Sequence, residues 1–190
     1  TAGLYPPGST FKMAVALAAL EARTLSPGDR IECPGWMDLG NVRFHCWRQG
    51  GHGMLDLRGG LKNSCDVFFY EVARRTGIDR ISAMAQQLGL GAPLDIELTG
   101  VRDGLVPTRA WLARKGRHWS LGDTVVSGIG QGYILVTPLQ LATYTARVAT
   151  GRAVMPHLVR RIGGAPAGPA AEPRPLGVPD RLLQPLRDGM

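Results

Sequence analysis

The sequence lacks any long apolar run, because its longest uninterrupted stretch, from Met13 to Leu20, has only eight residues. A helix that crosses a bilayer needs about 20, so no transmembrane helix is predicted among these 190 residues. The sequence also opens without a basic segment followed by an apolar one, so no signal peptide is expected in the residues given. Charged residues make up only 19% of the chain and apolar patterning is strong, which excludes a disordered chain.

Dense positive charge is absent as well, although the balance of charge is basic. The formal net charge is +7 and the pI is about 9.9, values that by themselves suggest a nucleic-acid partner. However, the basic residues are scattered, and their densest groups are the pairs Arg74-Arg75 and Arg160-Arg161. A dedicated nucleic-acid surface needs a denser stripe, so no nucleic-acid partner is predicted.

Glycine and proline divide the chain into the expected elements. Helices are predicted over 9–23, from just after Asn63 to before Gly77, over 79–89, and over 137–151, with Thr137-Pro138 starting the last one. Apolar residues surround the axis of the first helix, which is typical of a helix buried on nearly all sides. The other expectations are an irregular excursion over 26–60, a turn over 128–132, a strand over 154–162, a loop over 163–179 and the start of a helix in the last twelve residues.

Ser9 and Lys12 form the clearest chemical pair in the sequence. They are three residues apart at the start of the buried helix, so both side chains fall on one face. Lys12 is the only charge between Ser9 and Glu21, and both burial and the helix macrodipole favour a neutral amine there. A neutral amine beside a serine is what a general base for a nucleophile requires, and the N–H groups of the helix terminus can stabilise an oxyanion. The competing interpretation is a capping serine beside a lysine whose stem reaches the surface.

The sequence around this pair has the form of a known family. The block Tyr5-Pro6-Pro7-Gly8-Ser9-Thr10-Phe11-Lys12 resembles the first active-site motif of the penicillin-binding proteins, the D,D-transpeptidases of peptidoglycan. Within that family it is similar to the class B enzymes of the cell-elongation machinery. Further stretches agree in consistent order from roughly Tyr5 to Leu158, namely Gly51-His52-Gly53, residues 63–70, residues 76–80, Pro107-Thr108-Arg109 and residues 128–133.

The resemblance implies an α/β (α+β) fold, the serine β-lactamase/D,D-transpeptidase-like fold with a helical lobe beside a mostly antiparallel sheet. The family's second motif, Ser-x-Asn, falls on Ser64 and Asp66. An Asp in the third position departs from the general pattern but is similar to the elongation enzymes. The resemblance implies that Ser64 relays protons between Ser9, Lys12 and the leaving amine. From the residues alone, Ser64 is also a candidate N-cap of the following helix, and Asp66 a first-turn acid that complements the helix dipole.

The family's third motif, Lys-Thr/Ser-Gly, does not occur in residues 1–190. In the family it lies on a strand downstream of the Pro-rich loop, so the resemblance places it beyond Met190. We therefore expect residues 1–190 to be a partial transpeptidase domain, incomplete at both ends, with 163–179 as a Pro/Gly-rich loop within it. Such a piece is expected to be an inefficient transpeptidase by itself, because it lacks one wall of the active site.

Cysteine is rare, and all three cysteines lie in one segment together with a histidine. Cys33, Cys46, His52 and Cys65 are separated by 13, 6 and 13 residues. No C-x-x-C spacing supports a common zinc finger, but thiolate and imidazole are the ligands that structural Zn²⁺ prefers. A Cys3His zinc site is the favoured interpretation. A disulfide with one cysteine left over is the alternative, and His45 is an alternative ligand.

The resemblance adds to the zinc interpretation. Some elongation enzymes carry a metal site of Asp, His and Cys between the serine helix and the second motif. The resemblance places Cys33 and Cys46 where those enzymes carry carboxylates. Structural Zn²⁺ is therefore the expected cofactor, and no organic cofactor is expected.

The activity that the resemblance implies is the crosslinking of peptidoglycan stem peptides through an acyl-enzyme on Ser9, with β-lactam antibiotics acylating the same serine. The implied partners are a membrane-embedded glycosyltransferase and other proteins of the elongation complex. The implied location is the bacterial inner membrane, with the catalytic domain in the periplasm. Two alternatives remain: a class D-like β-lactamase or β-lactam sensor, which shares S-x-x-K, and a non-catalytic, zinc-stabilised scaffold module.

Overall fold

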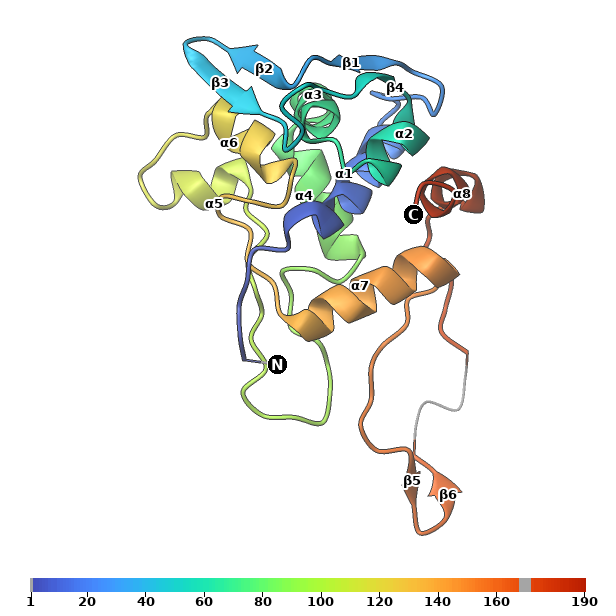
Figure 1. Ribbon diagram of the computed structural model, residues 1–190. Coiled ribbons are helices and arrows are strands. Elements are labelled where there is room, and N and C mark those ends of the chain that lie inside the picture. Colours follow the sequence, from blue (N-terminus) through green and yellow to red (C-terminus); the bar gives the residue numbers. More distant parts are fainter. Residues whose placement is uncertain (1, 168–171) are drawn as a thin grey trace.

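Helix α1, Lys12–Glu21, lies at the centre of the computed structural model, which describes residues 2–167 and 172–190 (Figure 1). Its residues from Lys12 to Leu20 are all buried. They are covered by α3 (Asp66–Thr76), α4 (Ile78–Gln87) and α8 (Asp180–Arg187), which pack against α1. The helix is therefore buried on nearly all sides, as the apolar residues around its axis predict.

The other elements surround this centre. The 3-10 helix η1 (Gly8–Phe11) leads into α1, and the remaining helices are α2 (Leu57–Lys62), α5 (Arg109–Ala113), α6 (Leu121–Ser127) and α7 (Pro138–Thr150). The strands form antiparallel pairs: β1 (Ile31–Cys33) with β4 (Gly53–Leu55), β2 (Trp36–Leu39) with β3 (Val42–His45), and β5 (Arg161–Ile162) with β6 (Ala165–Pro166). The α/β class is confirmed, and the helical lobe makes up most of the described residues. None of the helices in these residues is both long enough and apolar enough to cross a membrane.

The predicted helices with strong end signals are confirmed. Helix α7 begins with a capping box, in which the Thr137 hydroxyl accepts from the Gln140 N–H and the Gln140 side chain accepts from the Thr137 N–H. It ends at Gly151, whose φ of 67° suits a glycine at a helix C-terminus. Helix α3 ends at Thr76, directly before Gly77, as the sequence predicts. These local signals fix where the long helices begin and end.

Two expectations about elements need correction. The strand predicted over 154–162 is limited to Arg161–Ile162, because Pro156 has no N–H and the described residues offer β5 only the two residues of β6 as a partner. The excursion over 26–60 is more regular than expected. It contains β1 to β4 and most of α2. The N-cap of α2 is Asp56, whose side chain accepts from the Gly59 N–H.

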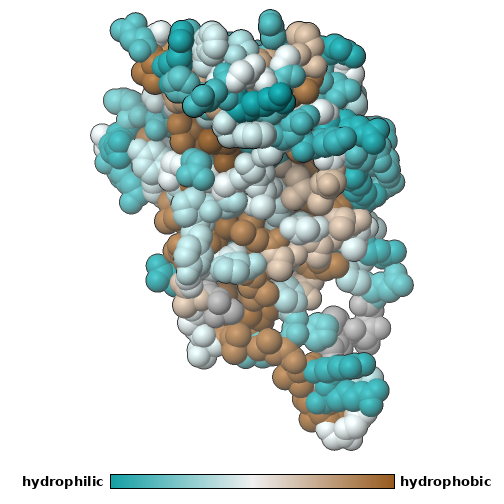
Figure 2. All heavy atoms as spheres, in the orientation of Figure 1, coloured by the Kyte–Doolittle hydropathy of each residue, from teal (hydrophilic) through white to brown (hydrophobic). Residues whose placement is uncertain are grey.

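The segment that leads to β5 and β6 forms an arm that projects from the body of the molecule (Figure 1). Its exposed apolar side chains include Leu158, Val159 and Ile162, and Figure 2 shows hydrophobic surface reaching this arm beside strongly hydrophilic residues. The predicted Pro/Gly-rich loop over 163–179 includes β6, and residues 168–171 of it lie outside the described residues.

Candidate active site

The serine expected as the nucleophile lies in η1, just before α1 begins. Gly8 has a φ of 58°, and its N–H donates to the Gly130 carbonyl at 3.0 Å. A Cβ atom on Gly130 would collide with the Gly8 carbonyl. The predicted turn over 128–132 can therefore pack this closely against η1 only because residue 130 is a glycine. The turn holds Ser9 at the surface, where its side chain is exposed.

Lys12 extends from α1 to the start of α3. Its Nζ donates to Ser64 Oγ at 3.0 Å, to the Ser64 carbonyl at 2.8 Å and to Asp66 Oδ1 at 2.7 Å. Only 2% of the Lys12 side chain and 14% of the Asp66 side chain are exposed. The Lys12 N–H also donates to the Ser9 carbonyl. The structure thus brings the side chains of Lys12, Ser64 and Asp66 into contact, and it places Ser9 in the turn that leads into Lys12.

The expectation of a neutral Lys12 amine rests on burial and the helix dipole, and the structure adds a carboxylate that the expectation did not include. A carboxylate in direct contact favours the ammonium form, and it opposes the effects of burial and of the helix dipole on which the expectation was based. The sequence pattern identifies Asp66 as an acid of a helix first turn, and gives no signal that it pairs with Lys12. In the structure Lys12 and Asp66 form a buried ion pair.

The interpretation of Ser64 as an N-cap is wrong by one residue. The N-cap of α3 is Cys65, whose Sγ accepts from the Phe68 N–H at 3.4 Å. Ser64 has a φ of 47°, a strained conformation for a residue with a side chain, which persists where neighbouring contacts impose it. Here both the hydroxyl and the carbonyl of Ser64 accept from Lys12, and because Cys65 caps the helix, the Ser64 hydroxyl is available for the active site.

One further residue contacts these side chains and another contacts the turn that carries Ser9, and the sequence gives neither of them a catalytic assignment. Trp47 is 64% exposed beside the site, and its N–H donates to Asp66 Oδ2 at 2.9 Å. Asp66 therefore joins Lys12 to the segment that follows β3. Tyr144 of α7 is fully buried, and its hydroxyl contacts the backbone of Thr10 and Ala14. The sequence indicates only that Tyr144 lies on the apolar face of a predicted helix, and it gives no sign of the contact with α1.

The residues predicted as metal ligands also converge. The ligand atoms of Cys33, Cys46, His52 and Cys65 all lie within 4.8 Å of one another. His52 Nδ1 is 3.6 Å from both Cys33 Sγ and Cys46 Sγ, and Cys46 Sγ is 4.0 Å from Cys65 Sγ. The three cysteines are free thiols, and His45, the alternative ligand, does not belong to this group. The donor set can hold one metal ion.

Electrostatics favour the ligand forms of two of these side chains. Burial raises the pKa of Cys46, but hydrogen bonds from the backbone of Arg48 and Val67 outweigh it, so the pKa lies below its ordinary value. Burial and the charge of Arg48 lower the pKa of His52, which keeps the imidazole neutral. Burial raises the pKa of Cys65, and a bound metal ion would reverse that shift. Within the described residues His52 Nε2 is buried without a hydrogen-bond partner, and His52 Nδ1 contacts the sulfurs of Cys33 and Cys46.

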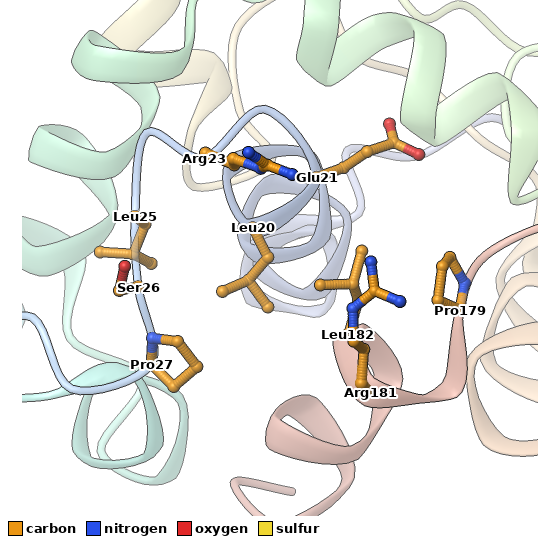
Figure 3. Close-up of a pocket in the computed structure, with 9 residues that line it drawn as sticks. All are labelled: Leu20, Glu21, Arg23, Leu25, Ser26, Pro27, Pro179, Arg181 and Leu182. Atoms are coloured by element: carbon orange, nitrogen blue, oxygen red, sulfur yellow. The ribbon is translucent and has the colours of Figure 1, made fainter.

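A pocket of about 420 Å³ lies at the other end of α1 (Figure 3). Its apolar lining comes from Leu20, Leu25 and Leu182, and its charged lining from Glu21, Arg23 and Arg181. It is separated from Ser9 by the length of α1 and is not part of the candidate active site.

The fold and this arrangement of serine, lysine and second serine are typical of the proteins that carry the S-x-x-K motif. The family of the penicillin binding protein transpeptidase domain matches residues 1–181, and the chain belongs to this family.

Individual relatives agree with the family. The peptidoglycan D,D-transpeptidase MrdA of Salmonella typhimurium is 40% identical over 190 residues, which cover 97% of this chain and 30% of that protein. MrdA of Haemophilus influenzae is 41% identical over 177 residues, which cover 91% of this chain and 27% of that protein. The chain thus spans less than a third of the length of these curated relatives.

Solved structures show the same fold. PBP2 of Pseudomonas aeruginosa in complex with WCK 5153 has a TM-score of 0.90 and 36% identity, covering 98% of this chain and 42% of that one. PBP2 of Helicobacter pylori in complex with MreC has a TM-score of 0.88 and 33% identity, covering 99% of this chain and 35% of that one.

Proposed function

We propose that this chain carries the acylation centre of a peptidoglycan D,D-transpeptidase that crosslinks stem peptides during cell elongation. The observation that supports this most directly is the convergence of Lys12, Ser64 and Asp66 beside the turn that presents Ser9. The curated relatives of the chain are named for this activity.

In the proposed reaction, Ser9 Oγ attacks the penultimate D-alanyl carbonyl carbon, and the bond from that carbon to the nitrogen of the terminal D-alanine breaks. The proton from Ser9 passes by way of Ser64 Oγ and Lys12 Nζ to the leaving nitrogen. In this step Lys12 acts as a neutral amine that accepts the Ser9 proton and passes it on, so it ends the step in the form in which it began. The amine of a neighbouring stem peptide then attacks the acyl-enzyme and forms the crosslink. A β-lactam acylates Ser9 by the same attack on its ring amide.

Acylation by a fluorescent penicillin tests this proposal in the protein as it is naturally encoded. We expect a stable adduct that mass spectrometry locates on Ser9, no adduct in Ser9→Ala, and normal labelling in Ser26→Ala, an exposed serine near the opposite end of α1. A β-lactamase would hydrolyse the adduct and turn over. A chain that serves only as a scaffold would not be labelled, and either result would contradict the proposal.

The same proposal extends to the setting of the reaction. The H. pylori relative was solved in complex with MreC, and another neighbour, 34% identical, with a TM-score of 0.87, belongs to a peptidoglycan synthase complex that coordinates polymerization and crosslinking. We propose elongation-complex partners and a membrane-embedded glycosyltransferase for this protein too, at the bacterial inner membrane with the catalytic domain in the periplasm. Copurification from crosslinked cell envelopes, with a cytosolic fraction as the control, tests both points.

We further propose that Cys33, Cys46, His52 and Cys65 hold a structural Zn²⁺. Tetrahedral zinc with bonds of about 2.3 Å to sulfur and about 2.05 Å to nitrogen places nitrogen and sulfur about 3.6 Å apart and two sulfurs about 3.8 Å apart. The distances of 3.6 Å and 4.0 Å between these atoms fit that geometry. A site with four protein ligands leaves no open position for substrate, so the ion would serve structure.

The zinc content of the purified protein tests this site, with the two histidines as a matched pair. We expect about one zinc per chain in the wild type and in His45→Ala, and much less in His52→Ala, because Cys3His coordination needs all four ligands. Since thiolate sites bind zinc tightly, less than about a tenth of a zinc per wild-type chain after purification without chelator would contradict the proposal.

A further inference from the structure

The first turn of α1 contains a side chain from another helix. In a regular α-helix the carbonyl of residue 10 accepts directly from the N–H of residue 14. Here the Tyr144 hydroxyl contacts both groups: the Ala14 N–H donates to it at 2.9 Å, and it donates to the Thr10 carbonyl at 2.9 Å. Tyr144 comes from α7, about 130 positions along the chain, and its side chain is fully buried.

This bridge lies where η1 becomes α1, between the nucleophile and the start of the regular helix. On its N-terminal side the Lys12 N–H donates to the Ser9 carbonyl, the i→i+3 bond of a 3-10 turn. Side chains at i and i+3 eclipse in a 3-10 turn, whereas in an α-helix they are offset by about 60°. The 3-10 turn therefore stacks Ser9 on Lys12 more closely than a helix that was regular from residue 9 would.

We propose that Tyr144 is a positioning residue for acylation, whose hydroxyl holds the turn that directs Ser9 toward Lys12. By occupying the space between Thr10 and Ala14, the hydroxyl prevents the α-helical bond from forming there and keeps η1 in its 3-10 form. This inference rests on the proposed function of Ser9.

The surrounding structure holds the Tyr144 hydroxyl between Thr10 and Ala14. Helix α7 is fixed at its start by the capping box of Thr137 and Gln140, both of which have no exposed surface. Tyr144 has no exposed surface either, and burial raises the pKa of Tyr144. The hydroxyl is therefore protonated at every physiological pH, and it can donate and accept at the same time.

Tyr144→Phe tests the inference, because it removes the hydroxyl and keeps the ring. Rapid-mixing kinetics with a chromogenic β-lactam on the naturally encoded protein separate non-covalent binding from the rate of the acylation step. Displacement of a reacting group by a fraction of an ångström to 1 Å reduces rates by about tenfold to a hundredfold. We expect a loss of that size in the acylation step, with the binding constant changed less than twofold, and we expect altered hydrogen exchange at the Ala14 amide.

Thr76→Val is the matched control, since Thr76 is also buried and its hydroxyl contacts Thr24, just beyond the opposite end of α1. It loses a buried hydroxyl without touching the turn of Ser9, so its acylation rate should equal that of the wild type. If Tyr144→Phe acylates within fivefold of Thr76→Val, or if its Ala14 amide exchanges as in the wild type, the inference is wrong. If the wild type is not acylated at all, the proposed function itself fails, which is a separate outcome.

Discussion

Burial, rather than distance, distinguishes the ion pair of Asp66 from that of Asp38. Lys12 Nζ to Asp66 Oδ1 and Arg43 Nε to Asp38 Oδ1 both measure 2.7 Å. The Asp66 side chain is 14% exposed and that of Asp38 is 52% exposed. Solvent screens the Arg43–Asp38 pair, whereas loss of Asp66 leaves an ammonium buried without its counter-charge.

Asp66→Ala and Asp66→Asn are therefore expected to differ. Removal of one partner from a buried ion pair costs about 3–5 kcal/mol of stability, and we expect Asp66→Ala to lose that amount and most of its acylation rate. Asn keeps an oxygen for Lys12 and restores the family's Ser-x-Asn pattern. A hydrogen bond to a charged group contributes about 1.5–3 kcal/mol, so Asp66→Asn should lose roughly half as much stability and acylate within about tenfold of the wild type. Denaturant unfolding and penicillin acylation measure the two effects.

Asp38→Ala is the control for this comparison, and it should leave both quantities unchanged. Equal unfolding free energies for Asp66→Ala and Asp38→Ala would show that the buried pair contributes nothing to stability. An Asp66→Asn protein as inactive as Asp66→Ala would show that the charge, and not the oxygen acceptor, is what Lys12 requires.

At the scale of elements, the sequence predicts those whose ends are set by their own residues. Thr137-Pro138 and Gly151 delimit α7, and Gly77 separates α3 from α4, so these helices are found where the sequence places them. Helix α2 escapes prediction because it contains Gly59 and Gly60, which are unfavourable in a helix. The strand predicted over 154–162 fails because a strand needs a partner, and pairing is decided by the fold rather than by local propensity.

The candidate site likewise has a part that local sequence predicts and a part that depends on the fold. Ser9 and Lys12 share one turn, so their proximity follows from their spacing, and the cysteines and His52 are identified by their chemistry. The pairing of Lys12 with Asp66 spans 54 positions, and no local pattern reports it. The displacement of the N-cap from Ser64 to Cys65 depends on a φ of 47° at Ser64, a conformation that a serine rarely adopts and that local sequence does not predict.

At the scale of the whole molecule, the proposed metal site connects the excursion after α1 to Ser64 and Asp66 of the candidate active site. Cys33 ends β1, Cys46 follows β3, His52 precedes β4, and Cys65 caps α3 between Ser64 and Asp66. The strands of the excursion are only three or four residues long, and such short pairs have little stability of their own. An ion held by all four ligands would therefore fix the excursion to the start of α3.

Removal of the metal is accordingly expected to affect both stability and acylation. A ligand present at a thousand times its Kd stabilises the folded state by about 4 kcal/mol, and 1 kcal/mol corresponds to about 2–4 °C in Tm for a domain of this size. We therefore expect a strong chelator to lower Tm by about 8–16 °C. It should also slow acylation of Ser9, because Cys65 adjoins the two residues that hold Lys12. Thermal unfolding and penicillin labelling should recover together when Zn²⁺ is restored, and Mg²⁺, which prefers oxygen ligands, should restore neither. If Tm falls while the acylation rate at 20 °C stays unchanged, the metal stabilises the excursion but does not position Ser64.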